Sequence, residues 1–475
     1  MGAVFLTDDD RAKIERIAGA MFVQQRALSQ VPKMASAVVL DGEVISFNGH
    51  DASPDSLFRI ASMTKSFSAA ATLLIRDEGL VRLDEPVGTY VPEYARLVGP
   101  TADAPAITLR QLLTMSSGLA TDDPWGDRHL DITDSEFDAV VQNGPTFGRD
   151  PGTGFEYSNL GYGIIGRVIH RVTGDRPQAF ITRRILQPLG MHHTVWEASQ
   201  APDGTDVIIG TRSDFVTPET APLDGGLATM GGLWSTVADL AKWIAFFTDA
   251  FPPRDDGDLF PLRRASRREM QCMHTFHEPL AQQASDGTEI TNNGGYGMGL
   301  LLQHDEHLGE IVGHSGGLPG YGSNMRWFKG SGFGVIALGN ATYAPMATAT
   351  RRVLQALSAA KVVRKPVREV PERLRTAGDR LFALLSNWTP EAATDLFADN
   401  VGPDQAFAER RTEAVEFLAK HQSLRSMRIE ATSNSAGHLV VASPTTELSI
   451  PFMLAVAPGP DGAPLVQSYD LPSDF

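Results

Sequence analysis

Ser62-Met63-Thr64-Lys65 stands just before an apolar run from Phe67 to Ile75, and this stretch decides how the rest of the chain is interpreted. The run predicts a helix, so Ser62 and Lys65 lie at positions i and i+3 on one face of its first turn. A serine hydroxyl needs a base within hydrogen-bond reach, and a lysine can serve when its surroundings lower its pKa. The helix N-terminus also favours negative charge near the serine. The spacing therefore predicts a nucleophile, with a solvated helix start as the alternative.

A second motif, Tyr157-Ser158-Asn159, follows a Gly and Pro-rich loop at 144–154 and leads into an expected helix from Leu160 to Val172. The phenol of Tyr157 is placed to relay the proton from Ser62 to a leaving group. The amide of Asn159 can hold both Lys65 and a substrate carbonyl. A packed tyrosine is the alternative reading of this motif.

A third motif, His314-Ser315-Gly316-Gly317, follows an expected strand over Glu310–Gly313. Its glycines let a substrate backbone lie along the strand edge, with Ser315 and Gly316 in contact with it. The backbone N–H groups of Gly317 and Ser62 can together form an oxyanion hole, while His314 assists orientation or charge. A simple turn is the alternative. Tyr321 is a candidate for the acyl pocket, and core packing is its alternative.

These three motifs, in this order, resemble those of the serine β-lactamase and penicillin-binding protein superfamily. The resemblance is to the branch of class C β-lactamases, D-aminopeptidases and family VIII esterases, in which a tyrosine begins the second motif. It covers roughly residues 20–350. Further matching stretches are Leu83–Val87, Ile107–Leu119, Gly225–Leu227 and Ser235–Leu240.

The resemblance implies an α+β fold of the β-lactamase/transpeptidase-like kind, in which an antiparallel sheet is flanked by helices and a helical region, with the site in the groove between them. It implies that Ser62 is the acylated nucleophile and that Lys65 and Tyr157 share proton transfer. It also implies that Asn159 positions the substrate and that the amides of Ser62 and Gly317 hold the oxyanion. The reaction is then acylation followed by hydrolysis or acyl transfer.

His314 stands where typical β-lactamases have a lysine, and a mostly neutral imidazole attracts a substrate carboxylate less strongly than an ammonium does. The expected substrate is therefore a small-molecule ester, amide or short peptide without an anionic group beside the scissile bond. A D-amino-acid-specific peptidase, a β-lactamase and an acyltransferase are alternative enzymes. A penicillin-recognising sensor or a degenerate binding scaffold is the alternative without turnover.

The chain is long enough for two domains, with the larger one first. We predict a hydrolase domain over residues 1–360, a linker over 361–372 and a C-terminal α+β accessory domain over 373–475. The linker is indicated by alternating charge, valines and two prolines. In the last part, one helical face over Leu374–Trp388 and an alternating strand over Leu448–Val456 suggest a small sheet, cone-shaped around a helix.

Within the first domain, Thr7 and Asp10 resemble a capping box that opens a helix, and Asp41-Gly42 suits a two-residue hairpin turn. Early and late strands are expected to share one sheet, with helices between them in sequence. The expected strands are Ser36–Leu40, Glu43–Phe47, Glu310–Gly313, Asn324–Phe328 and Phe333–Leu338. The expected helices are Ser66–Arg76, Leu109–Met115, Leu160–Val172, Pro177–Leu186 and Thr236–Phe247.

Composition restricts the partners. Lys and Arg total 41 against 57 Asp and Glu, a formal charge of −16, and no basic run offers a phosphate-binding face, so no nucleic-acid partner is expected. A homo-oligomer is compatible with the sequence. Neither the pair His192-His193 nor His274 with His277 is completed to a metal site at recognisable spacing, and no cofactor is expected.

Compartment is inferred from cysteine use and hydropathy. The single cysteine, Cys272, cannot form an internal disulfide and is expected to be a buried thiol. The first residues show neither a basic n-region nor a long apolar stretch, and no apolar run near a motif approaches the roughly 20 residues that span a bilayer. We therefore expect a cytoplasmic protein without a membrane partner.

Overall fold

The computed structural model describes residues 6–254, 256–283, 289–305, 308–362, 370–421, 423–444 and 446–472. The chain divides into two compact units, Gly2–Lys365 and Pro366–Phe475. Of the predicted linker 361–372, residues 363–369 lie outside the described residues. Each unit is described by itself.

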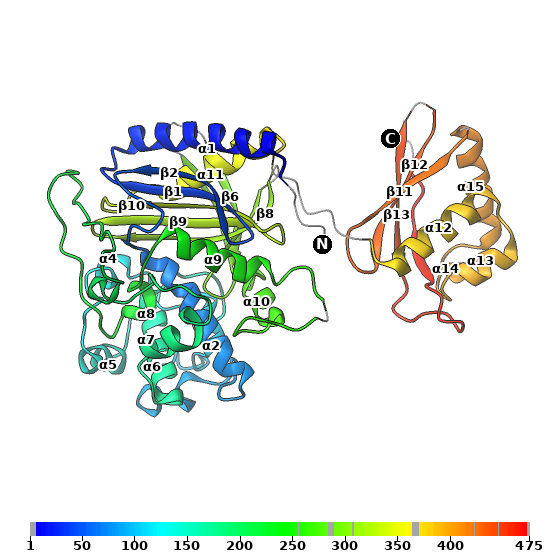
Figure 1. Cartoon of the computed structure of the whole chain (residues 1–475). Coiled ribbons are helices and arrows are strands. Elements are labelled where there is room, and N and C mark those ends of the chain that lie inside the picture. The colour runs from blue at the N-terminus through cyan, green and yellow to red at the C-terminus, as the bar shows by residue number, and fades with distance from the viewer. Residues whose placement is uncertain are drawn as a thin grey trace. The chain divides into compact units, whose positions relative to one another are not determined.

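An antiparallel sheet of eight strands forms the frame of the first unit, in the order β2-β1-β10-β9-β8-β7-β6-β5 (Figure 1). The pairing of β1 with β10 joins the early strands to the late ones, as the sequence predicted. Asp41 and Gly42 both have positive φ, 48° and 88°, as a two-residue turn of type I′ requires. The strands are β1 Met34–Leu40, β2 Glu43–His50, β5 Thr275–Gln283, β6 Glu289–Tyr296, β7 Leu301–Asp305, β8 Gly309–Leu318, β9 Tyr321–Phe328 and β10 Phe333–Gly339.

Helices cover both faces of this sheet. On one face lie α1 (Asp8–Ser29) and α11 (Met346–Ala359), which bury Ile14, Phe22 and Val353 against the strands (Figure 1). The predicted capping box at Thr7 and Asp10 is present at the start of α1. On the other face, α9 (Val237–Thr248) packs against β1 and β10.

The helical region lies on the α9 side of the sheet and includes the longest buried helices of the unit (Figure 1). Its elements are α2 Thr64–Asp77, α3 Leu109–Leu113, α4 Asp123–Gly126, α5 Asp134–Gln142, α6 Asn159–Thr173, α7 Pro177–Ile181 and α8 Ala228–Gly231, with α10 Arg264–Met270 nearby in sequence to β5. A two-stranded ladder of β3 (Phe58–Arg59) and β4 (Trp234–Ser235) leads into α2 and α9. The predicted helix over Pro177–Leu186 changes to a π-helical turn from Thr182.

The second unit is α+β. Its strands, in the order β11-β12-β13-β14, are β11 Arg425–Ala431, β12 Ala436–Ala442, β13 Glu447–Leu454 and β14 Val466–Tyr469. Its helices are α12 Glu372–Ser386, α13 Pro390–Leu396, α14 Val401–Asp404 and α15 Phe407–Lys420. The predicted apolar face of α12, including Leu374 and Leu381, is buried with Ile450 and Phe452. In the strand order β11 and β14 lie at the two edges, so the sheet is open.

Two findings concern solvent and membrane. Cys272 is exposed, which corrects the expectation of a buried thiol, because it follows α10 at the surface with its Sγ 3.3 Å from the Arg268 carbonyl. Among the described residues, no helix combines the length and the apolar character that crossing a bilayer demands.

Candidate active site

Ser62 lies in a tight turn between β3 and α2. A 3-10 turn over Ala61–Met63 follows the strand, and α2 begins at Thr64. Ala61 has φ of 49°, a left-handed conformation that costs an alanine about 1 kcal/mol. Strain of this kind persists only where packing over-determines the backbone, and such sites cluster where chemistry occurs. The turn is therefore compatible with a reactive Ser62, and its partners decide the assignment.

Lys65 is fully buried, and its ammonium nitrogen has three oxygen neighbours. Nζ lies 3.0 Å from Ser62 Oγ, 2.7 Å from Asn159 Oδ1 and 2.8 Å from the Met230 carbonyl. Burial lowers the pKa of Lys65 to about 8, and the charges of nearby carboxylates oppose this decrease. A neutral amine can donate to Asn159 and Met230 and keep its lone pair for the Ser62 proton. This arrangement can remove a proton from Ser62.

Asn159 is held by two consecutive aspartates at the start of α4. Asp122 accepts hydrogen bonds from the backbone N–H groups of Asn159 and Leu160, at 2.7 and 2.8 Å, and Asp123 accepts from Asn159 Nδ2 at 2.8 Å. The amide orientation is thereby fixed, with Oδ1 toward Lys65. Asn159 is fully buried and makes the expected contact with Lys65, while its contact with a substrate carbonyl stays a prediction.

Tyr157 borders the same lysine from the second motif. Lys65 Nζ lies 4.9 Å from the centroid of its ring. Burial raises the pKa of Tyr157 well above its usual value, and a hydrogen bond with Ser62 acts in the opposite direction. The phenol is therefore protonated at neutral pH and can pass a proton on, as a relay must.

The third motif forms the opposite wall, on β8. Pairing of β7 with β8 ends at Gly313, whereas β9 pairs with β8 as far as Leu318. A Cβ atom at Gly316 would lie 2.2 Å from the Ile60 carbonyl oxygen, so only glycine lets β8 pack against the turn that carries Ser62. Gly317 follows directly. The structure thus brings the predicted oxyanion residues into one region.

His314 is a neutral side chain in this wall. Its Nδ1 lies 2.5 Å from the Ser315 carbonyl, which only accepts, so we assign the proton to Nδ1. Nε2 then accepts from the Tyr296 hydroxyl at 2.9 Å. Burial, and next the charge of Lys65, lower the pKa of His314 to about 3. The imidazole therefore stays uncharged at neutral pH.

Two residues predicted to contact substrate have side chains engaged in other contacts. The Oγ of Ser315 accepts from Asn324 Nδ2 at 2.8 Å, and Asn324 Oδ1 accepts from Thr350 of α11, so Ser315 faces the α11 side of the sheet. Tyr321 is only 2 % exposed, and its hydroxyl donates to the Ile208 carbonyl and accepts from the Gly210 N–H. Core packing, the alternative for Tyr321, is what the structure has, because both hydrogen bonds are internal.

Several side chains in this region carry no sequence motif. Asp122, Asp123 and Asp127 act on Lys65, and Tyr296 orients His314. Arg59 donates to the Gly232 carbonyl at 3.1 Å and so holds the end of α8, the short helix that presents Met230. The signal available was the acidic cluster before Pro124 and the Gly-rich loop after Asp224. Neither indicates chemistry without the fold.

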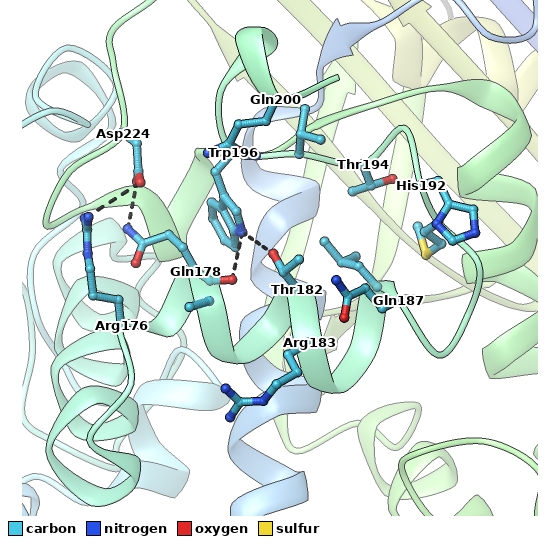
Figure 2. A pocket seen from close by; sticks show the side chains of 14 residues that line it. Arg176, Gln178, Thr182, Arg183, Gln187, His192, Thr194, Trp196, Gln200 and Asp224 are labelled. Atoms are coloured by element: carbon cyan, nitrogen blue, oxygen red, sulfur yellow. Dashed lines mark hydrogen bonds and ion pairs between the residues drawn. The ribbon is translucent and has the colours of Figure 1, made fainter. Parts of the chain in front are cut away.

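A hollow of about 690 Å³ lies in the helical region, away from the three motifs (Figure 2). Figure 2 shows Gln178 donating to Asp224, at 2.7 Å, and Trp196 donating to the Gln178 carbonyl and to Thr182 Oγ1, at 3.1 and 3.2 Å. These lining groups largely satisfy one another. In the described residues, no three His, Cys, Asp or Glu side chains gather to hold a metal ion. His192, which lines this hollow, therefore belongs to no such group.

The fold and the site define a class. An antiparallel sheet with a helical region, and a Ser-x-x-Lys turn where they meet, is the β-lactamase/transpeptidase-like architecture. The family model described as "Beta-lactamase" matches residues 20–360. The chain belongs to the β-lactamase family, whose members are in general serine hydrolases.

Relatives agree with this assignment. The chain is 26% identical over 347 residues to "Protein flp" of Staphylococcus aureus (strain N315), covering 70% of this chain and 64% of flp. It is 25% identical over 286 residues to "Penicillin-binding protein 4*" of Bacillus subtilis (strain 168), covering 57% and 58%. The matches thus span less than two thirds of these curated relatives.

Solved structures show a similar fold. The octameric penicillin-binding protein homologue from Pyrococcus abyssi aligns with a TM-score of 0.59 at 20% identity, covering 98% of this chain and 97% of that one. A class C β-lactamase aligns with a TM-score of 0.58 at 16% identity, covering 74% and 98%. The first of these extends over the C-terminal unit as well.

Proposed function

We propose that this chain is a serine hydrolase that forms an acyl-enzyme on Ser62 and cleaves small esters or amides without an anionic group beside the scissile bond. The observation that carries the proposal is the fully buried Lys65, whose Nζ lies 3.0 Å from Ser62 Oγ. Burial lowers the pKa of this lysine to about 8. A lysine that readily loses its proton beside a serine is an activated nucleophile pair.

The residues divide the reaction as follows. Neutral Lys65 takes the Ser62 proton while Oγ attacks the carbonyl carbon, and Tyr157 delivers a proton to the departing alcohol or amine. The N–H groups of Ser62 and Gly317 bind the oxyanion. Lys65 then passes the proton it took from Ser62 to the Tyr157 phenolate and is neutral again. Water attacks the acyl carbonyl and gives a proton to Lys65, which returns it to Ser62 Oγ as the ester bond breaks and the acid leaves. Transfer to another acceptor would use the same steps, so acyltransfer stays an alternative.

Charge at the site supports the substrate class. Three carboxylates act on Lys65, and His314 in the opposite wall is neutral. We call the side of the site that carries Lys65 and the three carboxylates the helical wall. A substrate carboxylate beside the scissile bond finds no ammonium in the third motif, and the carboxylates of the helical wall repel it. Esters whose acyl and alcohol parts carry no further charge are not repelled by the carboxylates and need no ammonium partner.

A D-amino-acid amide or peptide is the second candidate, and the same three carboxylates favour it. A free α-ammonium would be attracted to the carboxylates of Asp122, Asp123 and Asp127. Asp122 and Asp123 accept hydrogen bonds from α6, whereas Asp127 accepts one from the Tyr343 hydroxyl. The neutral imidazole of His314 disfavours a β-lactamase. The complete set of Ser62, Lys65 and Tyr157 disfavours a sensor without turnover.

Intact-mass measurement after a fluorophosphonate probe tests the nucleophile. We expect one adduct per chain, located at Ser62 by peptide mapping and absent in Ser62→Ala. Labelling at another residue, or none in a folded protein, would overturn the assignment of Ser62.

A substrate panel tests the class. We expect p-nitrophenyl butyrate to be turned over fastest, D-alanyl p-nitroanilide more slowly, and nitrocefin slowest. Dominance of the anilide would favour the peptidase, and dominance of nitrocefin would contradict the proposed preference. A single burst of product without later turnover would favour the sensor.

Assembly and location complete the proposal. The Pyrococcus abyssi homologue is described as octameric, which favours a homo-oligomer here too. Light scattering after size exclusion should then give a mass that is two or more times 51.3 kDa, and a mass equal to 51.3 kDa would contradict a homo-oligomer. A cytoplasmic location is supported by the single cysteine, and fractionation of cells expressing the full chain would test it.

A further inference from the structure

Tyr343 lies in the turn between β10 and α11 and packs on β8, which we call the oxyanion strand because it carries the proposed oxyanion residue Gly317. It has a left-handed backbone, with φ of 51°, and 46% of it is exposed. A Cβ atom at Gly317 would lie 2.6 Å from its ring carbon Cδ1, so the ring rests against the Gly317 backbone. Its N–H donates to the Leu318 carbonyl at 3.4 Å. The ring is therefore fixed to the end of β8.

The hydroxyl of Tyr343 reaches the helical wall. It donates to Asp127 Oδ2 at 2.9 Å, and Asp127 is only 3% exposed. Asp127 ends α4, whose start holds Asn159 through Asp122 and Asp123. A continuous series of contacts thus runs from Gly317 on β8 to Asn159, and from there to Lys65 on α2.

We infer that Tyr343 and Asp127 are positioning residues for the reaction at Ser62. Their hydrogen bond holds the oxyanion strand in place relative to the Ser62 and Lys65 wall, and the carboxylate of Asp127 also stabilises the charged form of Lys65. This inference rests on the proposed function, because it assigns to the pair a role in the same site.

The charge effect depends on every group that faces Lys65. These are three carboxylates, the phenols of two tyrosines and one imidazole, namely Asp122, Asp123, Asp127, Tyr157, Tyr162 and His314. Asp127 itself faces Tyr343, Lys65, Asp123 and Arg128. Burial raises the pKa of Asp127 to about 6, so this carboxylate is ionised at the pH where Lys65 titrates.

Asp127→Asn separates charge from position. Asparagine keeps an oxygen that can accept from Tyr343 but removes the negative charge, so the protonated form of Lys65 loses support. The acid limb is the rise in the rate of Ser62 labelling as Lys65 loses its proton. We expect this limb to move about one pH unit lower. Asp131→Asn is the matched control, because Asp131 is exposed in the same segment and its carboxylate does not act on Lys65.

Tyr343→Phe makes the opposite separation. Phenylalanine keeps the ring against Gly317 but cannot donate to Asp127, so the two walls lose their link. We expect kcat to fall about tenfold, KM to change less than threefold, and the acid limb to move by less than about half a unit. A purely structural role would lower thermal stability without this split between kcat and KM.

The rate of Ser62 labelling by the fluorophosphonate, measured from pH 5.5 to 9.5, reports the protonation state of Lys65 without a substrate. A limb in Asp127→Asn that coincides with those of wild type and Asp131→Asn would overturn the charge role. A Tyr343→Phe kcat within twofold of wild type would overturn the positioning role. Failure of the proposed function looks different: wild-type Ser62 would label with the expected pH limb while no ester or amide in the panel is turned over.

Discussion

The two walls that meet at Ser62 are built from different materials. The helical wall contains buried charge: Lys65 with its ring of carboxylates, each held by backbone or side-chain donors. The strand wall is uncharged and consists of the neutral His314, two glycines and a stretch of β8 that pairs with β9 but has no partner on the β7 side. Under the proposed function, the groups that activate the nucleophile and the groups that select a substrate lie on separate elements, so substitutions can be aimed at one wall or the other.

The largest expected effect comes from the helical wall. Ser62→Ala should lower kcat by about 10⁴-fold or more, because no other hydroxyl is placed against Lys65 Nζ among its three neighbours. Turnover of p-nitrophenyl butyrate is the measurement. Ser66→Ala on the same helix, whose hydroxyl bonds Met63 and Trp243, is the control for folding. Near-normal turnover in Ser62→Ala would contradict the division between the walls.

Gly316→Ala should break the strand wall. Its new methyl would lie 2.2 Å from the Ile60 carbonyl, so β8 must move from Ser62 and the oxyanion site opens. We expect kcat/KM to fall by about 10²-fold to 10³-fold, comparable to loss of an oxyanion donor. Ser315→Ala, on the α11 side of the same strand, should cost far less. Equal losses in the two variants would mean that strand stability alone is being measured.

The pH profile reports the helical wall without any substitution. Protonated Lys65 has no lone pair for the Ser62 proton, so kcat/KM should rise tenfold per pH unit and level off above about pH 8. The sign follows from burial, which disfavours the charged form and brings this pKa down from 10.5. Stopped assays from pH 5.5 to 9.5, corrected for spontaneous hydrolysis, measure the limb. A plateau already reached below pH 6 would remove Lys65 as the base.

His314→Lys should change selection more than activation. An ammonium in the strand wall would attract substrate carboxylates, so the ratio of nitrocefin to p-nitrophenyl butyrate turnover should rise about tenfold. His314→Gln keeps the wall neutral and should leave that ratio near the wild-type value. If glutamine changed it as much as lysine, shape rather than charge would be responsible.

The smallest effect is expected at the turn where the walls meet. Ala61→Gly relieves the left-handed strain at φ of 49° but gives the unfolded chain more freedom, so the two terms nearly cancel. The free energy of unfolding should change by less than about 1 kcal/mol, measured by denaturant titration. Ala61→Val, which adds a β-branched residue at positive φ, should be clearly destabilising, and the reverse order would mean the turn is unstrained.

Much of this could be predicted from the sequence because the signals are local. The capping box at Thr7, the hairpin turn at Asp41 and the Ser62 to Lys65 spacing each depend on residues within one turn. The strands β5 to β7 were missed, since β5 contains Pro279 and β6 contains two adjacent glycines, which suit an outer part of a sheet but not a strand pattern.

The site was predicted only where a motif marks it. Asp127 and Tyr343 are more than two hundred residues apart and meet through tertiary packing, so neither has a sequence signature. Tyr296 belongs to a strand that the pattern did not indicate. Ser315 and Tyr321 were placed by neighbourhood in sequence, and strand alternation turned one toward α11 while core packing enclosed the other.

The unpaired end of β8 also sets a limit on size. An exposed strand edge ordinarily invites the edge of another protein and with it aggregation. Here the stretch without a β7 partner is His314–Leu318, roughly 16 Å at about 3.3 Å per residue, and the Tyr343 ring packs against it at Gly317. Under the proposed function, a short acyl group or a chain end is expected to lie along this stretch. The Tyr343 ring beside it also hinders pairing with the strand of another protein, so the sheet does not grow at this edge.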